Sequence, residues 1–344
     1  MSTKPQRLER QCEWTALDVA NSDEWTLKLS AHDLSEIDNA VQLARSSSDD
    51  LLSIEREDFP LPNLSRRLRV LENELINGRG FGLIRGVDRA AYSNDDMCLI
   101  YWGIGAHLGT PWPQNKHGHL LGDVTDQGRG IDDPEARGNE LGGIPLPFHT
   151  DGSDLVGLMC LENGIDGGES AICNSVAVYN QMVTEVPDLA AELFKPQPYD
   201  FRGEQAPGGK PWYLMPVFTE HQGRLFVRYI RGYILASQRH ESAPRITEKA
   251  EQAMQYLDRL IDDPKHHVCM ALRPGDMQFI NNYHVLHGRK AYRDDRPSGR
   301  IRHLKRLWLE TRVLEDRPEY FQNQVGQHWN KNRKISRLDV QPVD

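Results

Sequence analysis

Three residues in two distant segments have the types and spacing of metal ligands. His149 and Asp151 lie two residues apart in "PFHTDG", directly before the apolar run "LVGLMCL". In an extended segment side chains alternate between faces, so this imidazole and this carboxylate would point the same way. A bare H-x-D pair is weak evidence, because most such pairs are ordinary loop residues. His287 in "NNYHVLHGR" is the third candidate, with His284 as a competitor. Two histidines and one carboxylate form a facial triad, which leaves positions on iron(II) open for other ligands.

A basic segment follows the distal histidine. If "GRIRHLKRLWLE" forms a strand, Arg302, Leu304, Arg306 and Trp308 share one face. Two arginines on an inward face carry a large desolvation cost unless anions meet them. A dicarboxylate bound at the metal would supply such anions, because a guanidinium pairs with a carboxylate through two parallel hydrogen bonds. The alternative is a solvated basic edge.

The elements that must position these residues change in character along the chain. Periodic apolar residues predict helices at 30–44, 63–78 and from Ser93 onward, with a strand at 81–87 between the last two. The stretch 109–147 is rich in Gly, Pro and polar residues, and long stretches of weak regular structure are often functional. The later chain alternates short apolar runs with two predicted helices: runs at 155–161, 225–231, 268–272, 277–280 and 304–309, and helices at 175–194 and 246–263. Short strands separated by loops predict a β-sandwich or barrel decorated by helices.

Composition narrows the class of protein. The 344 residues carry a net charge of -9 without a basic block, so nucleic acid is not an expected partner. The five cysteines form no C-x-x-C pair, which argues against a disulfide framework or a structural zinc site. The polar N-terminus has no apolar core of a signal peptide, and no apolar run approaches the length of a membrane span. We expect a cytoplasmic protein with a small-molecule substrate and no membrane partner; assembly into a homo-oligomer stays open.

Three segments together resemble a known family. "PFHTDGSDLVGLMCLENGIDGGES", "PGDMQFINNYHVLHGR" and "GRIRHLKRLWLE" are similar to the iron(II)/2-oxoglutarate dioxygenases of the taurine dioxygenase and clavaminate synthase-like superfamily. The resemblance covers roughly residues 80 to 312, and its pattern is H-x-D, a distal His and a C-terminal Arg, in that order. It implies a mainly β fold with flanking helices, a double-stranded β-helix or jelly roll. We expect one catalytic domain over 1–344, with a helical part at 1–80, the jelly roll with insertions at 81–312 and a tail at 313–344.

The resemblance also implies an activity and a set of roles. It places iron(II) on the three predicted ligands, with His284 as a supporting or loop residue. It places the distal carboxylate of 2-oxoglutarate on Arg302 and the chelating carboxylate near Arg306. Ser170 stands where the family often has a threonine that helps to hold this cosubstrate. The implied reaction uses O2 and 2-oxoglutarate to oxidise, by default to hydroxylate, a C–H bond of a small organic substrate, with release of succinate and CO2.

Substrate contacts are predicted at three further residues. Trp112 and Asn115 lie in the loop before the metal strand, and Arg231 lies in the predicted strand at 225–231, on the face of Tyr229. There Arg231 could pair with a substrate carboxylate or bridge to an acidic neighbour. The stretches 109–147 and 200–216 are candidates for mobile segments over the site.

Two other functions stay open at this stage. One is an oxygenase of the same fold that uses no 2-oxoglutarate, which the two arginines argue against. The other is a catalytically silent jelly-roll binding protein, which the intact triad argues against. Desaturation and ring closure use the same cofactor, so the fold does not choose the outcome or the substrate.

Overall fold

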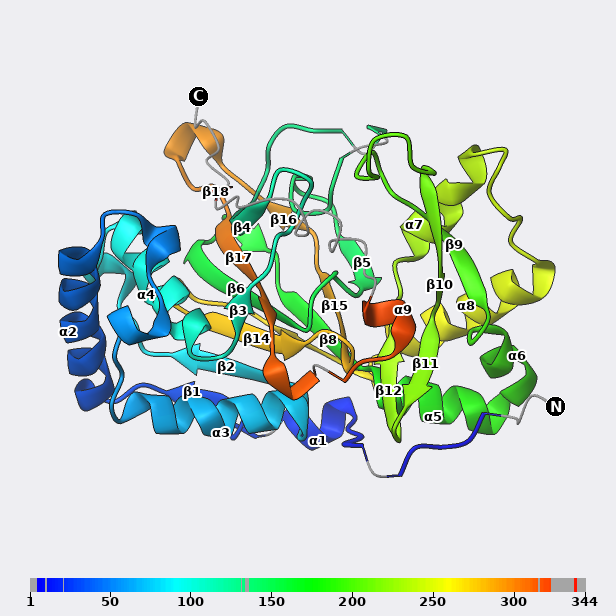
Figure 1. Cartoon of the computed structure of the whole chain (residues 1–344), viewed down its shortest axis with the longest axis horizontal. Coiled ribbons are helices and arrows are strands. Elements are labelled where there is room, and N and C mark those ends of the chain that lie inside the picture. The colour runs from blue at the N-terminus through cyan, green and yellow to red at the C-terminus, as the bar shows by residue number, and fades with distance from the viewer. Residues whose placement is uncertain are drawn as a thin grey trace.

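The computed structural model describes residues 5–9, 11–20, 22–130, 132–133, 136–314, 316–322 and 337–338. Two sheets dominate these residues (Figure 1). The large sheet contains, in spatial order, β1 (Thr26–Lys28), β2 (Phe81–Arg85), β14 (Met277–Asn281), β6 (Leu155–Glu162), β17 (His303–Glu310), β4 (His119–Thr125) and β18 (Arg337–Leu338), and β3 (Thr110–Pro111) pairs with β17. The small sheet contains β13 (His267–Met270), β8 (Ser170–Asn174), β15 (Val285–Arg289) and β5 (Leu146–His149).

Three two-stranded ladders and a set of helices complete the described chain. The ladders are β9 (Pro196–Asp200) with β10 (Trp212–Pro216), β11 (Phe218–His221) with β12 (Arg224–Val227), and β7 (Asp166–Gly167) with β16 (Tyr292–Arg293). The α-helices are α1 (Ala16–Ala20), α2 (Ala31–Ser47), α3 (Leu64–Ile76), α4 (Asn94–Ala106), α5 (Ser175–Glu185), α6 (Pro187–Glu192), α7 (Arg231–Ala236), α8 (Glu248–Asp262) and α9 (Glu319–Gln322). Short 3-10 turns occur at Leu51–Ser53, Arg56–Asp58, Arg89–Ala91, Ser237–Arg239, Arg296–Ser298 and Arg312–Leu314.

The inward faces of the two sheets pack against each other. Alternate residues of each strand supply one apolar cluster, which includes Val156 of β6, Ile280 of β14 and Leu304 of β17 from the large sheet. Ile172 of β8 and Val285 of β15 join it from the small sheet. Because side chains alternate along a strand, polar residues two or four positions away from these apolar residues also point between the sheets. This jelly roll confirms the fold class expected from the sequence.

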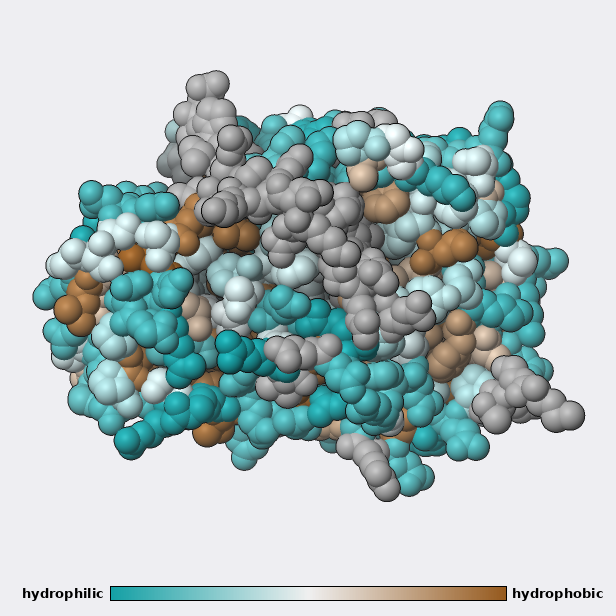
Figure 2. Space-filling view, viewed as in Figure 1, coloured by the Kyte–Doolittle hydropathy of each residue, from teal (hydrophilic) through white to brown (hydrophobic). Residues whose placement is uncertain are grey.

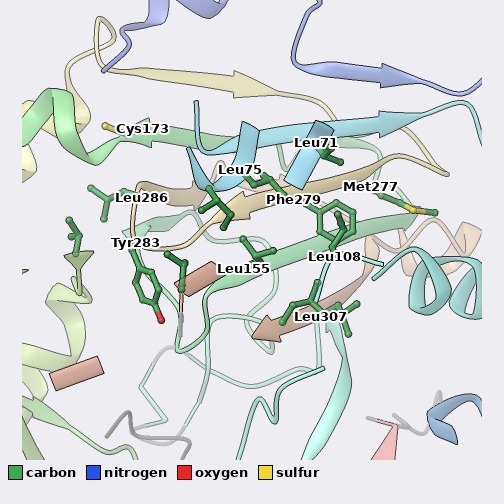
Figure 3. Close-up of a cluster of buried hydrophobic side chains, with 14 of the residues drawn as sticks. Leu71, Leu75, Leu108, Leu155, Cys173, Met277, Phe279, Tyr283, Leu286 and Leu307 are labelled. Atoms are coloured by element: carbon green, nitrogen blue, oxygen red, sulfur yellow. The ribbon is translucent and has the colours of Figure 1, made fainter. Parts of the chain in front are cut away.

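The outward faces are covered by helices. Figure 3 shows Leu71 and Leu75 of α3 gathered with Leu155, Phe279 and Leu307 of the large sheet. In Figure 1, α2, α3 and α4 lie at the left and bottom, and α5, α6, α7 and α8 lie at the right. The coloured part of the face in Figure 2 is mainly hydrophilic, with apolar patches between the hydrophilic areas.

Local sequence signals predicted several elements correctly. Ser30 and Ser93 cap α2 and α4, each with a capping box that an aspartate three residues later completes. The predicted helix at 175–194 instead breaks into α5 and α6 at Pro187, which begins the second helix. The stretch 109–147 also contains β4, which pairs with β17 although its residues do not alternate cleanly.

The predicted strand at 225–231 is too long. It ends at Val227, which pairs with Phe218, the first residue of β11, and among the described residues only one further hydrogen bond, from the Arg228 amide to the carbonyl oxygen of Val217, continues this pairing. Arg231 is therefore the first residue of α7 and does not share a strand face with Tyr229. No helix among the described residues has both the length and the apolar composition needed to cross a membrane.

Candidate metal centre

The structure brings the three predicted ligands together between the sheets. His149 ends β5, and His287 of β15 lies directly opposite it in the antiparallel ladder, with ring centroids 4.3 Å apart. Asp151 follows two residues later, with Oδ1 3.9 Å from His149 Nε2 and Oδ2 3.7 Å from His287 Nε2. One ligand atom from each residue lies within 4.8 Å of the other two, a spacing that one ion could bridge. No second group of this kind occurs in the described part of the chain.

Strand register explains why these side chains meet. Val285 and His287 alternate with the outward Leu286, so the imidazole points between the sheets. Gly288 lets β5 come close, because a Cβ there would lie 2.8 Å from the carbonyl oxygen of Leu146. His284, the competing histidine, lies in the turn before β15 and its Nε2 is 2.7 Å from the carbonyl oxygen of Cys12. It therefore anchors the N-terminal segment and is not part of the metal group.

The protonation states suit a divalent metal. Nδ1 of His149 lies 2.9 Å from the carbonyl oxygen of Pro147, so a proton on Nδ1 leaves the Nε2 lone pair facing the site. Burial, with repulsion from His287, lowers the pKa of His149 to about 3, so this ring is neutral at pH 7. Burial alone would raise the pKa of Asp151, but the Arg306 guanidinium and His287 hold it well below its usual range. Two imidazoles and an ionised carboxylate on one face fit ferrous iron.

Neighbouring side chains fix the carboxylate of Asp151. The indole Nε1 of Trp308 donates to Oδ2 at 2.9 Å, and Arg306 Nη1 lies 3.4 Å from the same oxygen. Arg306 Nε also donates to Gln114 Oε1 at 2.8 Å. Arg306 and Trp308 thus share the inward face of β17, as the alternation predicts.

Two residues that sequence reasoning missed hold the backbone of the same turn. Asn282, fully buried, accepts a hydrogen bond from the Asp151 amide at 2.6 Å and donates to the carbonyl oxygens of Asp151 and Ser153 at 2.8 Å each. The buried Arg228 donates to the carbonyl oxygens of Thr150 and Asp151. The only feature of the sequence that could have indicated Asn282 is its amide side chain within an apolar strand and turn. The only such feature of Arg228 is its positive charge.

Arg302 is a buried cation close to Arg289, which lies two residues after His287 on β15. Arg302 precedes the first residue of β17, so it flanks the strand instead of lying in it, yet it is only 4% exposed. Its Nη2 donates to the carbonyl oxygen of Gly168 at 3.2 Å, and its Nη1 has no hydrogen-bond partner among the described residues. Burial, with repulsion from Arg289, lowers its pKa to about 10. Ser170, buried on β8, donates from Oγ to Gln278 Oε1 of the facing sheet at 2.8 Å.

The predicted substrate residues do not all reach the site. Trp112 lies beside the turn that carries Asp151: its amide donates to the carbonyl oxygen of Trp308 at 2.8 Å, and it lines a small cavity with Gly152 and Ser153. Asn115 instead shapes its own turn, since its Oδ1 accepts from the amides of 117 and 119. Arg231 pairs with Glu251 and Asp258 of α8, which favours the acidic neighbour over a substrate carboxylate.

Comparisons with known proteins agree with this geometry. The family model "Taurine catabolism dioxygenase TauD, TfdA family" matches residues 44–308. The "FR-33289 synthase" of Streptomyces rubellomurinus is 29% identical over 299 residues, covering 86% of this chain and 88% of that protein. The "L-ornithine/L-arginine 3-hydroxylase" of Catenulispora acidiphila is 28% identical over 234 residues, covering 61% of this chain and 65% of that protein.

Solved structures show the same fold. An asparagine oxygenase structure superposes with a TM-score of 0.65 at 19% identity, covering 87% of this chain and 98% of that one. The non-haem iron oxygenase OrfP, solved with iron, succinate and (3S)-hydroxy-L-Arg, gives a TM-score of 0.63 at 18% identity, covering 91% of this chain and 99% of that one. The family match spans most of the chain, and the chain therefore belongs to the taurine catabolism dioxygenase TauD, TfdA family.

Proposed function

We propose that this chain is an iron(II)- and 2-oxoglutarate-dependent dioxygenase that hydroxylates a C–H bond of a small organic substrate. The observation that carries the proposal is the inward-facing triad together with a buried guanidinium, Arg302, that lacks a carboxylate partner among the described residues. When bound, iron(II) and 2-oxoglutarate would supply the redox chemistry: O2 is reduced, 2-oxoglutarate is converted to succinate and CO2, and the substrate C–H bond is oxidised.

The triad and its two neighbours, Trp308 and Arg306, would have separate roles in holding the metal. His149 and His287 would present imidazole nitrogens and Asp151 a carboxylate, so the three would hold the metal from one side and leave the other side open. Trp308 and Arg306 would keep the Asp151 carboxylate in its orientation when cosubstrate enters. This support matters because a loosely held ligand costs metal affinity.

The cosubstrate would extend from the metal toward Arg302. A buried guanidinium with an unpartnered Nη1 is suited to a carboxylate, which would relieve its desolvation cost. Arg306, already close to Asp151, would lie near the chelating end. Ser170 would have to share its hydroxyl between Gln278 and the cosubstrate, so we assign it a supporting contact only.

The substrate we propose is amino-acid-like. Relatives are named for hydroxylation of ornithine or arginine and of enduracididine, and neighbouring structures hold hydroxylated asparagine and arginine. Trp112, beside the metal-bearing turn, is the predicted substrate residue that the geometry supports best.

The test combines binding and turnover. Purified protein with iron(II) under anaerobic conditions should develop the metal-to-ligand charge-transfer band when 2-oxoglutarate is added, and should form succinate once O2 and a panel of amino acids are supplied. Asp151→Ala should lose both signals while its circular dichroism spectrum stays unchanged, because it removes a ligand without disturbing the apolar core. An iron-loaded wild type that gives no band with 2-oxoglutarate would contradict the proposal.

A further inference from the structure

A second buried arginine lies close to Arg302, near enough for its charge to lower the pKa of Arg302. Arg289 lies two residues after His287 on β15, so its side chain is on the same inward face, about 6.8 Å farther along the strand. It is 6% exposed, and in the ladder with β8 it is directly opposite Ser170. The strand that carries a metal ligand therefore also carries a cation, one inward position away.

The contacts of Arg289 leave part of its guanidinium unused. Nη2 donates to the carbonyl oxygens of Leu141 and Ile144, each at 3.0 Å. Nε has no hydrogen-bond partner among the described residues, and the same is true of the Tyr292 hydroxyl. The guanidinium carbons of Arg289 and Arg302 lie 4.8 and 5.2 Å from the centroid of the Tyr292 ring. Two buried arginines thus share one aromatic ring, and each keeps an unpartnered donor.

The positive charges of Arg289 and Arg302 are not balanced by direct ion pairs. Within the described part of the chain, no carboxylate lies within ion-pair distance of Arg289 or Arg302. The nearby Asp294 uses Oδ1 to accept from the backbone amide of Arg302, and its Oδ2 is unpartnered. Two buried like charges without paired anions are costly, so an anion from outside should bind between them.

We propose that Arg289 is a second binding residue for the distal carboxylate of 2-oxoglutarate and makes the pocket selective for a dicarboxylic 2-oxo acid. The inference rests on the proposed function, in which Arg302 binds the same carboxylate. Arg302 contributes Nη1 and Arg289 contributes Nε, while the bonds to Leu141 and Ile144 keep the Arg289 side chain in place.

The experiment compares two cosubstrates. 2-Oxopentanoate has the five-carbon chain and the chelating group of 2-oxoglutarate but a methyl group in place of the distal carboxylate. Arg289→Gln should weaken 2-oxoglutarate binding by about 10- to 150-fold, the range for a lost hydrogen bond to a charged group. Binding of 2-oxopentanoate should not change. Both affinities are measured by anaerobic titration of the iron-loaded protein and by calorimetric titration of the metal-free protein.

A matched control separates this role from a structural one. Arg293→Gln makes the same change four residues later at an exposed side chain paired with Asp166, and both affinities should equal those of the wild type. If Arg289 only anchors the loop at 141–144, Arg289→Gln would weaken both 2-oxo acids equally, and that result would overturn the inference. Arg289→Lys keeps the positive charge and should retain part of the preference for 2-oxoglutarate. Equal weakening of both acids in this variant again overturns the inference.

The two proposals fail in different ways. If the iron-loaded wild type binds neither 2-oxo acid, the proposed function falls and this inference falls with it. If the wild type binds 2-oxoglutarate and Arg289→Gln binds it equally well, only the role of Arg289 is wrong.

Discussion

Arg302 is the residue on which the proposed binding of 2-oxoglutarate depends most directly. If it holds the distal carboxylate of 2-oxoglutarate, Arg302→Ala should cost about 2–5 kcal/mol of binding, or roughly 30- to 5,000-fold in affinity. Arg302→Lys should recover only part of the loss, because an ammonium cannot reproduce the two-pronged contact. Anaerobic titration of iron-loaded wild type and variants measures this. Superimposed curves would show that Arg302 is not the anchor.

Trp308 is expected to fix the orientation of Asp151, a proposed metal ligand, through a single hydrogen bond. Its Nε1 donates to Asp151 Oδ2 at 2.9 Å, so Trp308→Phe removes one donor and keeps most of the apolar contact. Loss of such a supporting bond typically lowers metal affinity or activity by about 10- to 100-fold. Trp102→Phe is a matched control, since its Nε1 bonds to the carbonyl oxygen of Ile54 in the core instead. Competition with a chelator gives both iron affinities, and equal values for the two variants would refute the role of Trp308.

At the level of secondary structure, the turn after β5 that carries Asp151 is joined to the turn between β14 and β15. Asn282 joins them with three hydrogen bonds to Asp151 and Ser153. Asn282→Ala should lower the free energy of unfolding by about 2–4 kcal/mol, because it leaves buried backbone groups unsatisfied. Iron affinity should fall as well. Urea unfolding and a chelator titration measure the two effects, and a variant with wild-type values in both would show that the turns hold each other without Asn282.

At the scale of the whole molecule, we propose a single catalytic domain over 1–344. One apolar cluster contains Leu68 of α3, Ile100 of α4, Leu155 of β6 and Leu257 of α8, so residues from the predicted helical part and from both halves of the later chain share it. Most of the predicted tail at 313–344 lies outside the described residues. Limited proteolysis should not release residues 1–100 as a stable fragment. Recovery of such a fragment with its own cooperative unfolding transition would contradict the proposal.

Buried histidines should make the metal-free protein sensitive to acid. The pKa of His149 is about 3 in the folded chain, against about 6.5 for an unfolded histidine, so the unfolded state binds more protons between these values. Stability should therefore fall as the pH drops below 6.5, by about 2 kcal/mol at pH 5 from His149 alone. His284, with a pKa of about 4 caused by burial, acts in the same direction.

Urea unfolding of chelator-treated protein at pH 7 and pH 5 measures this loss. His149→Gln should lose about 2 kcal/mol less than the wild type over that interval, because the titrating ring is gone. His117→Gln is the control, since its side chain is exposed and no ion pair of it occurs among the described residues, and this variant should lose as much stability as the wild type. An unchanged loss in His149→Gln would show that His149 does not titrate as described.

Local patterns in the sequence were enough to predict the types of the site residues, their order along the chain and the family. Capping boxes at Ser30 and Ser93 place helix starts, and alternation places Arg306 and Trp308 on one face of a strand. Which faces meet depends on long-range packing. His149 and His287 are opposite each other through a ladder between strands far apart in the chain, and Arg231 pairs with α8 because β12 ends at Val227 and Arg231 begins α7. No local sequence pattern indicates the roles of Asn282, Arg228 and Arg289. Their side chains contact backbone groups far away in the sequence, and only long-range packing determines such contacts.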